Sequence, residues 1–474
     1  MHVLEAFARG IGWLAAYGLG GLACAGLLFN AKDKKGLGAN AALTFGAAIA
    51  VMVVSILYYV LYLKTSNLHA SFWGGALVSL LAAAAFRRRL GELLTALTEQ
   101  KTWRDWLADL VLAVGMITVF ALLEQFLPEY DGYIHERMAD ILVAVGHINV
   151  VTTYYRPGFL YLVAMTKLVW PTDSLFYTKF FFPSLFLLLA IRSFRLWTGP
   201  KSPWWLAWFA ALASPLFVSQ VIYFRAQTIV AMMLPLAAYA FLVRPERWLK
   251  FLMLVLGLLG VLFFHIFFVF VLMFSLPFLW SEFMRVRDWN VRERALGVAV
   301  ALLVVANMLP HLANLKVDLS AYLVFTGFHF VANPLFSLTA GGGGLSSLID
   351  LIKYYVDQGL FYMFCVAIVT LVAWRRGTIA EWRISRNLWL ATLALFIGAE
   401  VLPRIGLKYD PQRFWLFINL TLIMLVTSTV AGMSAFWQRR LTVFLGCMAA
   451  VSLLVVGYFV HTRAKTFKIG RAHV

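Results

Sequence analysis

The chain has 474 residues, of which 62% are hydrophobic and only 13% are charged. Soluble domains carry about twice that share of charged residues, so this chain cannot build the polar coat of a water-soluble protein. The composition excludes a soluble enzyme, a nucleic-acid-binding protein and a disordered scaffold. It indicates an integral membrane protein whose apolar surface faces lipid. The net charge of +18 fits this class, because surplus Lys and Arg mark the cytoplasmic loops of membrane proteins.

The first apolar run is predicted to be an uncleaved membrane anchor. Only Arg9 precedes it, whereas a basic cluster at 32–35 follows it, so the N-terminus is expected outside. The cysteines lie inside apolar runs without paired spacing, and they predict neither a disulfide framework nor a zinc site. They are Cys24, Cys365 and Cys447.

Apolar stretches predict an all-α, polytopic helical bundle with about fourteen membrane spans. A run at 249–280 is divided around His265, because one helix of that length would overrun a ~30 Å hydrocarbon core. The expected spans are 8–29, 41–63, 71–86, 107–126, 174–195, 204–222, 227–243, 249–264, 266–280, 295–311, 357–374, 387–402, 414–434 and 441–461.

The distribution of basic residues predicts which side each loop occupies. Seven short connections hold 24 of the 40 Lys and Arg, and the positive-inside rule places them in the cytoplasm. They lie near 30–40, 87–106, 192–203, 244–250, 281–294, 375–386 and 438–440. The two long loops, 127–173 and 312–356, then lie outside, so the active site is expected on the extracytoplasmic face of a plasma (inner) membrane.

Charged residues follow the fourth predicted span immediately. Glu129 and Asp131 come first, and His135 follows one helical turn after Asp131. Acids at the mouth of a membrane helix are candidate functional residues, because charge at membrane depth is unfavourable. The alternatives are that the two acids are solvated loop residues and that His135 lies on a polar interfacial surface.

The same loop predicts two interfacial helices. The first has Glu136 and Asp140 one turn apart on its polar side. Its apolar side is expected to consist of Tyr130, Ile134, Ala139 and Ile141. The second, over 159–170, is too short to span comfortably, so both helices are expected to lie in the interface and enclose a cleft at the lipid–water boundary.

Three groups of motif residues resemble GT-C-type glycosyltransferases, polytopic enzymes that take sugars from polyprenyl-phosphate carriers. The matching residues are Asp131, Gly146, Tyr155, Arg156, Pro157, Gly158, then Ala213-Ser214-Pro215, then Pro411-Gln412-Arg413-Phe414. The resemblance covers roughly 107–434. Two features depart from it: three additional spans precede the span that leads into the Asp-bearing loop, and Arg225-Ala226-Gln227 stands where an acid is common.

The resemblance implies displacement at an anomeric carbon, with Asp131 as the general base and a lipid phosphate as the leaving group. Glu129 is an alternative base, and His135 could share a proton with Asp131 or hold its carboxylate. The leaving phosphate needs fixed positive charge, for which the late outer loop offers Arg404, Lys408 and Arg413. The alternative for these three is binding to lipid head groups.

Weaker candidates complete the predicted site. Arg156 is a further phosphate ligand, and Tyr155, Arg225 and His265 are candidate cleft residues, although a structural role for His265 is favoured over ligand binding. No metal site is indicated and no cofactor is assigned. The acids near Asp131 could supply oxygen ligands for Mg²⁺ or Mn²⁺, but their spacing is unspecific.

The expected partners are a polyprenyl-phosphate-sugar donor, a lipid, glycan or protein acceptor, and membrane lipids, with no nucleic acid. One alternative is a lipid-linked glycan polymerase or ligase of another fold, whose active loop would be 312–356. A second alternative is a transporter or lipid flippase, which predicts paired halves and charges within the spans.

The expected organisation has accessory membrane helices over 1–106, a catalytic core over 107–434 and a final membrane helix over 435–467. The last residues, 468–474, read KIGRAHV, which resembles translated adapter sequence. The natural protein is therefore expected to continue beyond about Phe467.

Overall fold

The structure is a computed structural model in which every regular element of the described residues is a helix. The described residues are 2–29, 37–123, 130–145, 157–169, 176–198, 202–222, 228–244, 246–264, 359–375, 382–400 and 411–471, with single positions at 271, 291, 295, 298 and 302. This architecture confirms the predicted all-α fold.

The chain divides into two compact units. Unit 1 contains 1–196, 221–282 and 460–474, and unit 2 contains 197–220 and 283–459. These units are defined by packing, and the division into accessory helices and a catalytic core stays a prediction.

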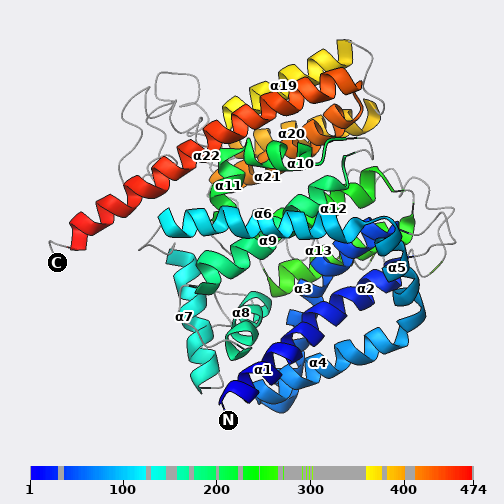
Figure 1. The fold of residues 1–474 in the computed structure, drawn as a ribbon, viewed down its shortest axis with the longest axis vertical. Helices are drawn as coiled ribbons and strands as arrows, with labels where there is room; N and C mark the ends of the chain where they lie inside the picture. Colours follow the sequence, from blue (N-terminus) through cyan, green and yellow to red (C-terminus); the bar gives the residue numbers. More distant parts are fainter. Residues whose placement is uncertain are drawn as a thin grey trace. The chain divides into compact units, whose positions relative to one another are not determined.

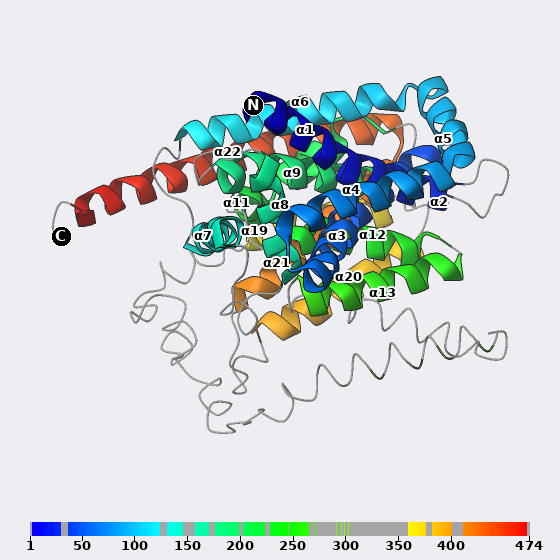
Figure 2. The same ribbon diagram turned by 90° about the horizontal axis from the view of Figure 1, so that it is seen from below.

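Unit 1 is a bundle of helices. Within it, α5 and α7 lie at opposite ends of α6 (Figures 1 and 2). Its helices are α1 (His2–Trp13), the π-helical turn η1 (Leu14–Leu19), α2 (Gly20–Leu28), α3 (Ala39–Thr65), α4 (Leu68–Ala85), α5 (Arg87–Glu99), α6 (Thr102–Leu123), α7 (Tyr130–Val145), α8 (Pro157–Val169), the π-helical turn η2 (Tyr177–Phe181), α9 (Phe182–Arg195), α12 (Thr228–Leu242) and α13 (Arg247–Phe263).

Local sequence explains the sharp reversal between α3 and α4. Ser66 takes a left-handed conformation with φ 50°, which ends α3. Asn67 then caps α4, because its side-chain Oδ1 accepts a hydrogen bond from the Ala70 amide at 3.0 Å. These two residues let neighbouring apolar helices run antiparallel with a minimal connection.

Unit 2 contains a group of helices in which α19 and α20 each pack against α21 (Figure 1). Its helices are α19 (Leu360–Arg375), α20 (Trp382–Glu400), α21 (Pro411–Ala431) and the short α10 (Leu206–Leu212), and α11 (Pro215–Ile222) and α22 (Ala435–Arg471) begin in it. Almost all of α21 is buried, so it forms the core of this unit.

Among the described residues, six helices are long and apolar enough to cross a membrane. They cover Phe7–Leu28, Ala39–Thr65, Leu68–Ala85, Thr102–Leu122, Phe414–Ala431 and Ala435–Tyr458. Each coincides with a predicted span, which supports an integral membrane protein. The expected count of fourteen is not reached here: other predicted spans are shorter or broken helices, such as α10 and α11, and 266–280 and 295–311 fall almost wholly outside the described residues.

The structure corrects the prediction for the two helices of the first outer loop. The buried side of α7 consists of His135, Glu136, Ala139 and Leu142, whereas Ile141 is exposed. The acid-bearing side therefore faces the protein. All residues of α8 from Gly158 to Val169 are buried, so α8 is an internal helix and does not lie on a surface. Buried ion pairs explain this difference, as the next section describes.

Candidate functional site

The first turn of α7 carries Asp131, the predicted general base. Asp131 is the second residue of this helix, and His135 follows one turn later. The structure describes the backbone of Asp131 but not its side chain, and Glu129 lies outside the described residues. The site is therefore built from the side chains that fix α7 in place.

His135 is buried against α8. Its ring centroid lies 4.6 Å from that of Phe159, with the rings nearly perpendicular. Burial lowers the pKa of His135 to about 4, because the imidazolium would lose its hydration. His135 is consequently neutral at physiological pH, which favours a hydrogen-bonding role for it over an ion pair with Asp131.

Lys167 of α8 joins the two outer-loop helices. Its ammonium lies 3.3 Å from Glu136 Oε1 and 2.5 Å from Asp140 Oδ1. The side chains of Lys167 and Glu136 are 4% and 0% exposed, whereas that of Asp140 is 38% exposed. A buried charge requires a partner, so these pairs fix the buried side of α7 against α8. The Tyr177 ring, whose centroid is 5.9 Å from the ammonium, adds a weaker contact.

The last turn of α8 is held from the N-terminal helix. Arg9 donates a hydrogen bond to the Leu168 carbonyl at 2.9 Å, and the Trp13 indole donates to Thr166 Oγ1 at 3.2 Å. The terminal carbonyls of a helix have no partner within the helix, so Arg9 supplies what Leu168 would otherwise lack. Together with Lys167, these contacts make the α7–α8 pair a fixed part of unit 1.

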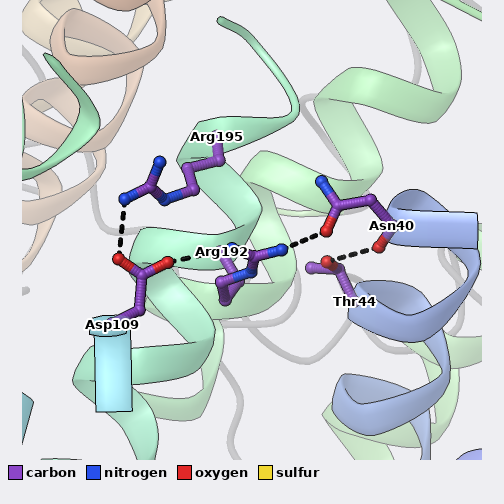
Figure 3. Close-up of polar contacts among 5 residues, drawn as sticks. All are labelled: Asn40, Thr44, Asp109, Arg192 and Arg195. Atoms are coloured by element: carbon purple, nitrogen blue, oxygen red, sulfur yellow. Dashed lines mark hydrogen bonds and ion pairs between the residues drawn. The ribbon is translucent and has the colours of Figure 1, made fainter. Parts of the chain in front are cut away.

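A second buried ionic cluster joins α3, α6 and α9 (Figure 3). Arg192 lies between Asp109 and Asn40, and it donates to the Asp109 carboxylate at 2.9 Å and to the side-chain oxygen of Asn40. Arg195 donates to the other oxygen of Asp109 at 2.7 Å. Asn40 is held in turn by Thr44, whose hydroxyl donates to its backbone carbonyl at 2.8 Å. One carboxylate thus binds two guanidinium groups, and the cluster joins three helices.

Unit 2 contains a buried polar contact at the break between α10 and α11. The Ser214 hydroxyl donates to Asn419 Oδ1 of α21 at 2.6 Å, and it also accepts from the Phe217 amide at 3.2 Å. Asn419 is anchored further by a bond from its Nδ2 to the Trp415 carbonyl at 2.8 Å. Gly359 takes φ +90° beside it, where a Cβ atom would lie 2.5 Å from Asn419 Oδ1. Only glycine fits this close approach.

The predicted phosphate ligand Arg413 lies in the first turn of α21, six residues before Asn419. Its backbone is described and its side chain is not. The remaining predicted site residues fall outside the described residues. They are Arg404, Lys408, Arg156, Tyr155, Arg225 and His265.

Sequence reasoning missed the residues that organise both buried clusters. Lys167, Asp109 and Arg192 each stand within or at the edge of an apolar run, and an ionisable residue in such a run is a signal for a buried partner. The sequence does not show which partner each of them binds, because the paired residues lie 27 and 83 positions apart in the chain.

Within the described part of the chain, no group of three or more His, Cys, Asp or Glu could hold a metal ion. Two motif segments of the glycosyltransferase resemblance, 213–215 and 411–414, belong to helices that meet in unit 2 through Ser214 and Asn419. We found no match to the chain among protein-family models, curated proteins or solved structures. The resemblance to GT-C-type glycosyltransferases rests on the motif residues alone.

Proposed function

We propose that this protein is a membrane glycosyltransferase that moves a sugar from a polyprenyl-phosphate-linked donor to an acceptor hydroxyl. The observation that carries the proposal is the position of Asp131 in the first turn of α7. This helix follows the apolar helix α6 and is fixed by buried side chains from its second turn onward. A general base must be held in one orientation to act, and a fixed helix provides that support.

The proposed reaction is one displacement at the anomeric carbon of the donor sugar. The Asp131 carboxylate takes the proton of the acceptor hydroxyl while the hydroxyl oxygen attacks that carbon. The bond between the carbon and the phosphate oxygen breaks, and its electron pair leaves with the lipid phosphate. Arg413, with Arg404 and Lys408 from the preceding loop, stabilises the charge that develops on this phosphate.

The proposal also covers the finer membrane arrangement. We place the chain in the plasma (inner) membrane with about fourteen spans, and we place the active site on the extracytoplasmic face. The support is the low basic content of the 127–173 loop relative to the short connections.

The test is a turnover assay of membranes containing the full-length protein, using a panel of labelled polyprenyl-phosphate sugars. Asp131→Asn keeps the shape of the side chain and removes its ability to accept a proton. Turnover should fall at least ~100-fold, the lower bound for loss of a general base, while donor binding survives. The matched control is Glu92→Gln on α5, near the opposite end of α6, which should leave turnover unchanged.

Variants of two other acids near Asp131 show whether Asp131 itself is the general base. Asp140→Asn should reduce turnover only mildly, because Lys167 keeps its buried partner Glu136. If Asp131→Asn is nearly normal and Glu129→Gln is inactive, the base is Glu129. Normal turnover in both variants would reject the glycosyltransferase mechanism.

The same assay examines the leaving phosphate. Arg413→Ala should weaken use of the lipid donor far more than it lowers protein abundance. Arg413→Lys should restore activity only partly, because a point charge replaces a planar, two-pronged donor. Unchanged donor use in Arg413→Ala would remove Arg413 from the mechanism.

A further inference from the structure

The first two turns of α22 carry exposed basic and aromatic residues. Phe436, Arg439 and Arg440 are exposed, and they follow the short connection between α21 and α22. With Ala435 and Val443 they line a recess of about 630 Å³.

The opposite side of the same turns is attached to the protein. Gln438 is buried, and its side-chain nitrogen donates to the Ala431 carbonyl at the end of α21 at 2.8 Å. Thr442 is buried on the same side one turn later. Further along, Gly446 packs against Phe209 of α10, because a Cβ atom added at Gly446 would lie 3.1 Å from the Phe209 ring. The helix is therefore oriented so that Phe436, Arg439 and Arg440 face away from these anchors.

The two arginines have no protein anion nearby in sequence. The segment from Pro411 to Val474 contains no Asp or Glu. Among the described residues neither guanidinium forms an ion pair, and Arg440 instead stacks on Phe436, with its Cζ 4.1 Å from the ring centroid. Cations in the first turns of a helix are also disfavoured by the helix dipole, so helix stability does not explain them. Among the described residues no protein anion meets the positive charge in this recess, so an anion from outside the protein can bind there.

The rest of α22 fixes the depth of this recess relative to a bilayer. The helix is a candidate span over Ala435–Tyr458, and only 33% of its most apolar stretch is buried, so much of its surface is free to face lipid. Nineteen residues separate Arg439 from the exposed Tyr458. At 1.5 Å per residue this distance is about 28 Å, close to the ~30 Å thickness of a hydrocarbon core. The arginines then lie level with one layer of head groups, and Tyr458 lies at the other.

We infer that the start of α22 binds the head group of an anionic glycerophospholipid. Arg439 and Arg440 bind the phosphate, and Phe436 holds the Arg440 guanidinium in place. The acyl chains run along the exposed apolar side of the helix, past Val443 and Leu454. This site is distinct from the proposed donor site, which involves residues of α7, of the first turn of α21 and of the loop that precedes it.

The test uses native mass spectrometry of the purified full-length protein. Phosphatidylglycerol and phosphatidylcholine with identical acyl chains are compared, and inorganic phosphate serves as a competitor. The wild type should bind phosphatidylglycerol in preference, and inorganic phosphate should not displace it. The paired change Arg439→Gln with Arg440→Gln should weaken phosphatidylglycerol binding roughly five-fold for each arginine removed, about 25-fold in all.

The matched control is Arg383→Gln with Arg386→Gln, which removes the same charge from two exposed positions on α20. This pair should change binding less than two-fold. Equal losses in both pairs, equal binding of the two lipids, or displacement by inorganic phosphate would each overturn the inference.

Two further variants keep the test informative if the glutamine pair folds poorly. Arg439→Lys with Arg440→Lys keeps the charge and should preserve the preference for phosphatidylglycerol. Phe436→Ala removes the ring beneath Arg440 and should weaken binding roughly two- to five-fold. Loss of the preference in the lysine pair, or no change in Phe436→Ala, would contradict the proposed geometry.

Discussion

The buried charges of the two ionic clusters in unit 1 are tolerated because each lies within hydrogen-bonding distance of a side chain of opposite charge. Lys167 has Glu136 and Asp140, and Asp109 has Arg192 and Arg195. Removing one partner of such a pair typically costs about 3–5 kcal/mol, because the remaining charge stays buried and uncompensated. His135 lies beside Glu136 in the chain but avoids this problem in another way, since burial keeps it neutral.

Stability should therefore depend on pH through His135. In the unfolded chain this imidazole binds a proton below its usual pKa of about 6.5, whereas in the folded protein it does so only near 4. Between these values the unfolded state binds more protons, so stability should fall as the pH decreases from about 6.5 to 4, by at most about 3 kcal/mol. Thermal unfolding of the detergent-solubilised protein across this range measures the effect.

The comparison for His135 is between two glutamine variants. His135→Gln should flatten the pH dependence, whereas His69→Gln, at an exposed position of α4, should keep the wild-type slope. Parallel slopes in all three proteins would show that His135 does not carry the effect.

At the scale of elements, small residues let α2 and α3 approach each other closely. A Cβ atom at Gly46 would lie 2.5 Å from the Gly21 carbonyl oxygen and 2.6 Å from the Ala25 nitrogen. Both neighbours are backbone atoms, which cannot rotate away as a side chain does. Membrane helices associate through this kind of small-residue contact, because lipid provides no hydrophobic driving force between them.

Gly46→Ala should therefore force α2 and α3 apart. We expect a loss of roughly 1–3 kcal/mol in unfolding free energy, the usual range for overpacking. Gly115→Ala on α6 is the matched control, since nothing lies within 4 Å of its Cβ position, and it should be neutral or slightly stabilising. Denaturation of both variants in the same detergent measures the difference, and equal stabilities would refute the close-contact explanation.

The elements that the sequence predicted well are those with long apolar runs between polar ends. The ends of α3, α4 and α21 lie within three residues of the expected spans, because loss of hydropathy coincides with a break in the helix. The burial of α8 and the break before α11 were not predicted. An apolar run of 13 residues reads the same whether it faces lipid or protein, and only the distant partners of Lys167 decide the matter.

At the scale of the molecule, contacts within unit 1 bring together segments that the loop charges predict to lie on the same side, and which side faces the cytoplasm stays a prediction. Asn40, Asp109 and Arg192 meet in one cluster, and all three lie in or close to segments placed on the cytoplasmic side. Arg9 and Leu168 meet near the other predicted face, where both the N-terminus and the first long loop were expected. Of the candidate site, the sequence located Asp131 and His135 on one helix, but it could not give the packing that fixes that helix.

The sidedness itself can be tested with single cysteines in a background that lacks Cys24, Cys365 and Cys447. Positions Gly132 and Leu407 should react with a membrane-impermeant thiol reagent added outside intact cells. Gly91, an exposed position on α5, should react only after the membrane is opened.

The physical reason is that the short connections hold 24 of the 40 Lys and Arg, and cytoplasmic retention of basic residues sets the orientation of the spans between them. Because Gly132 follows α6 and Gly91 precedes it, these two sites must label from opposite sides if α6 crosses the bilayer. Labelling of Gly132 or Leu407 only from the cytoplasm would invert the topology and move Asp131 away from any extracytoplasmic donor.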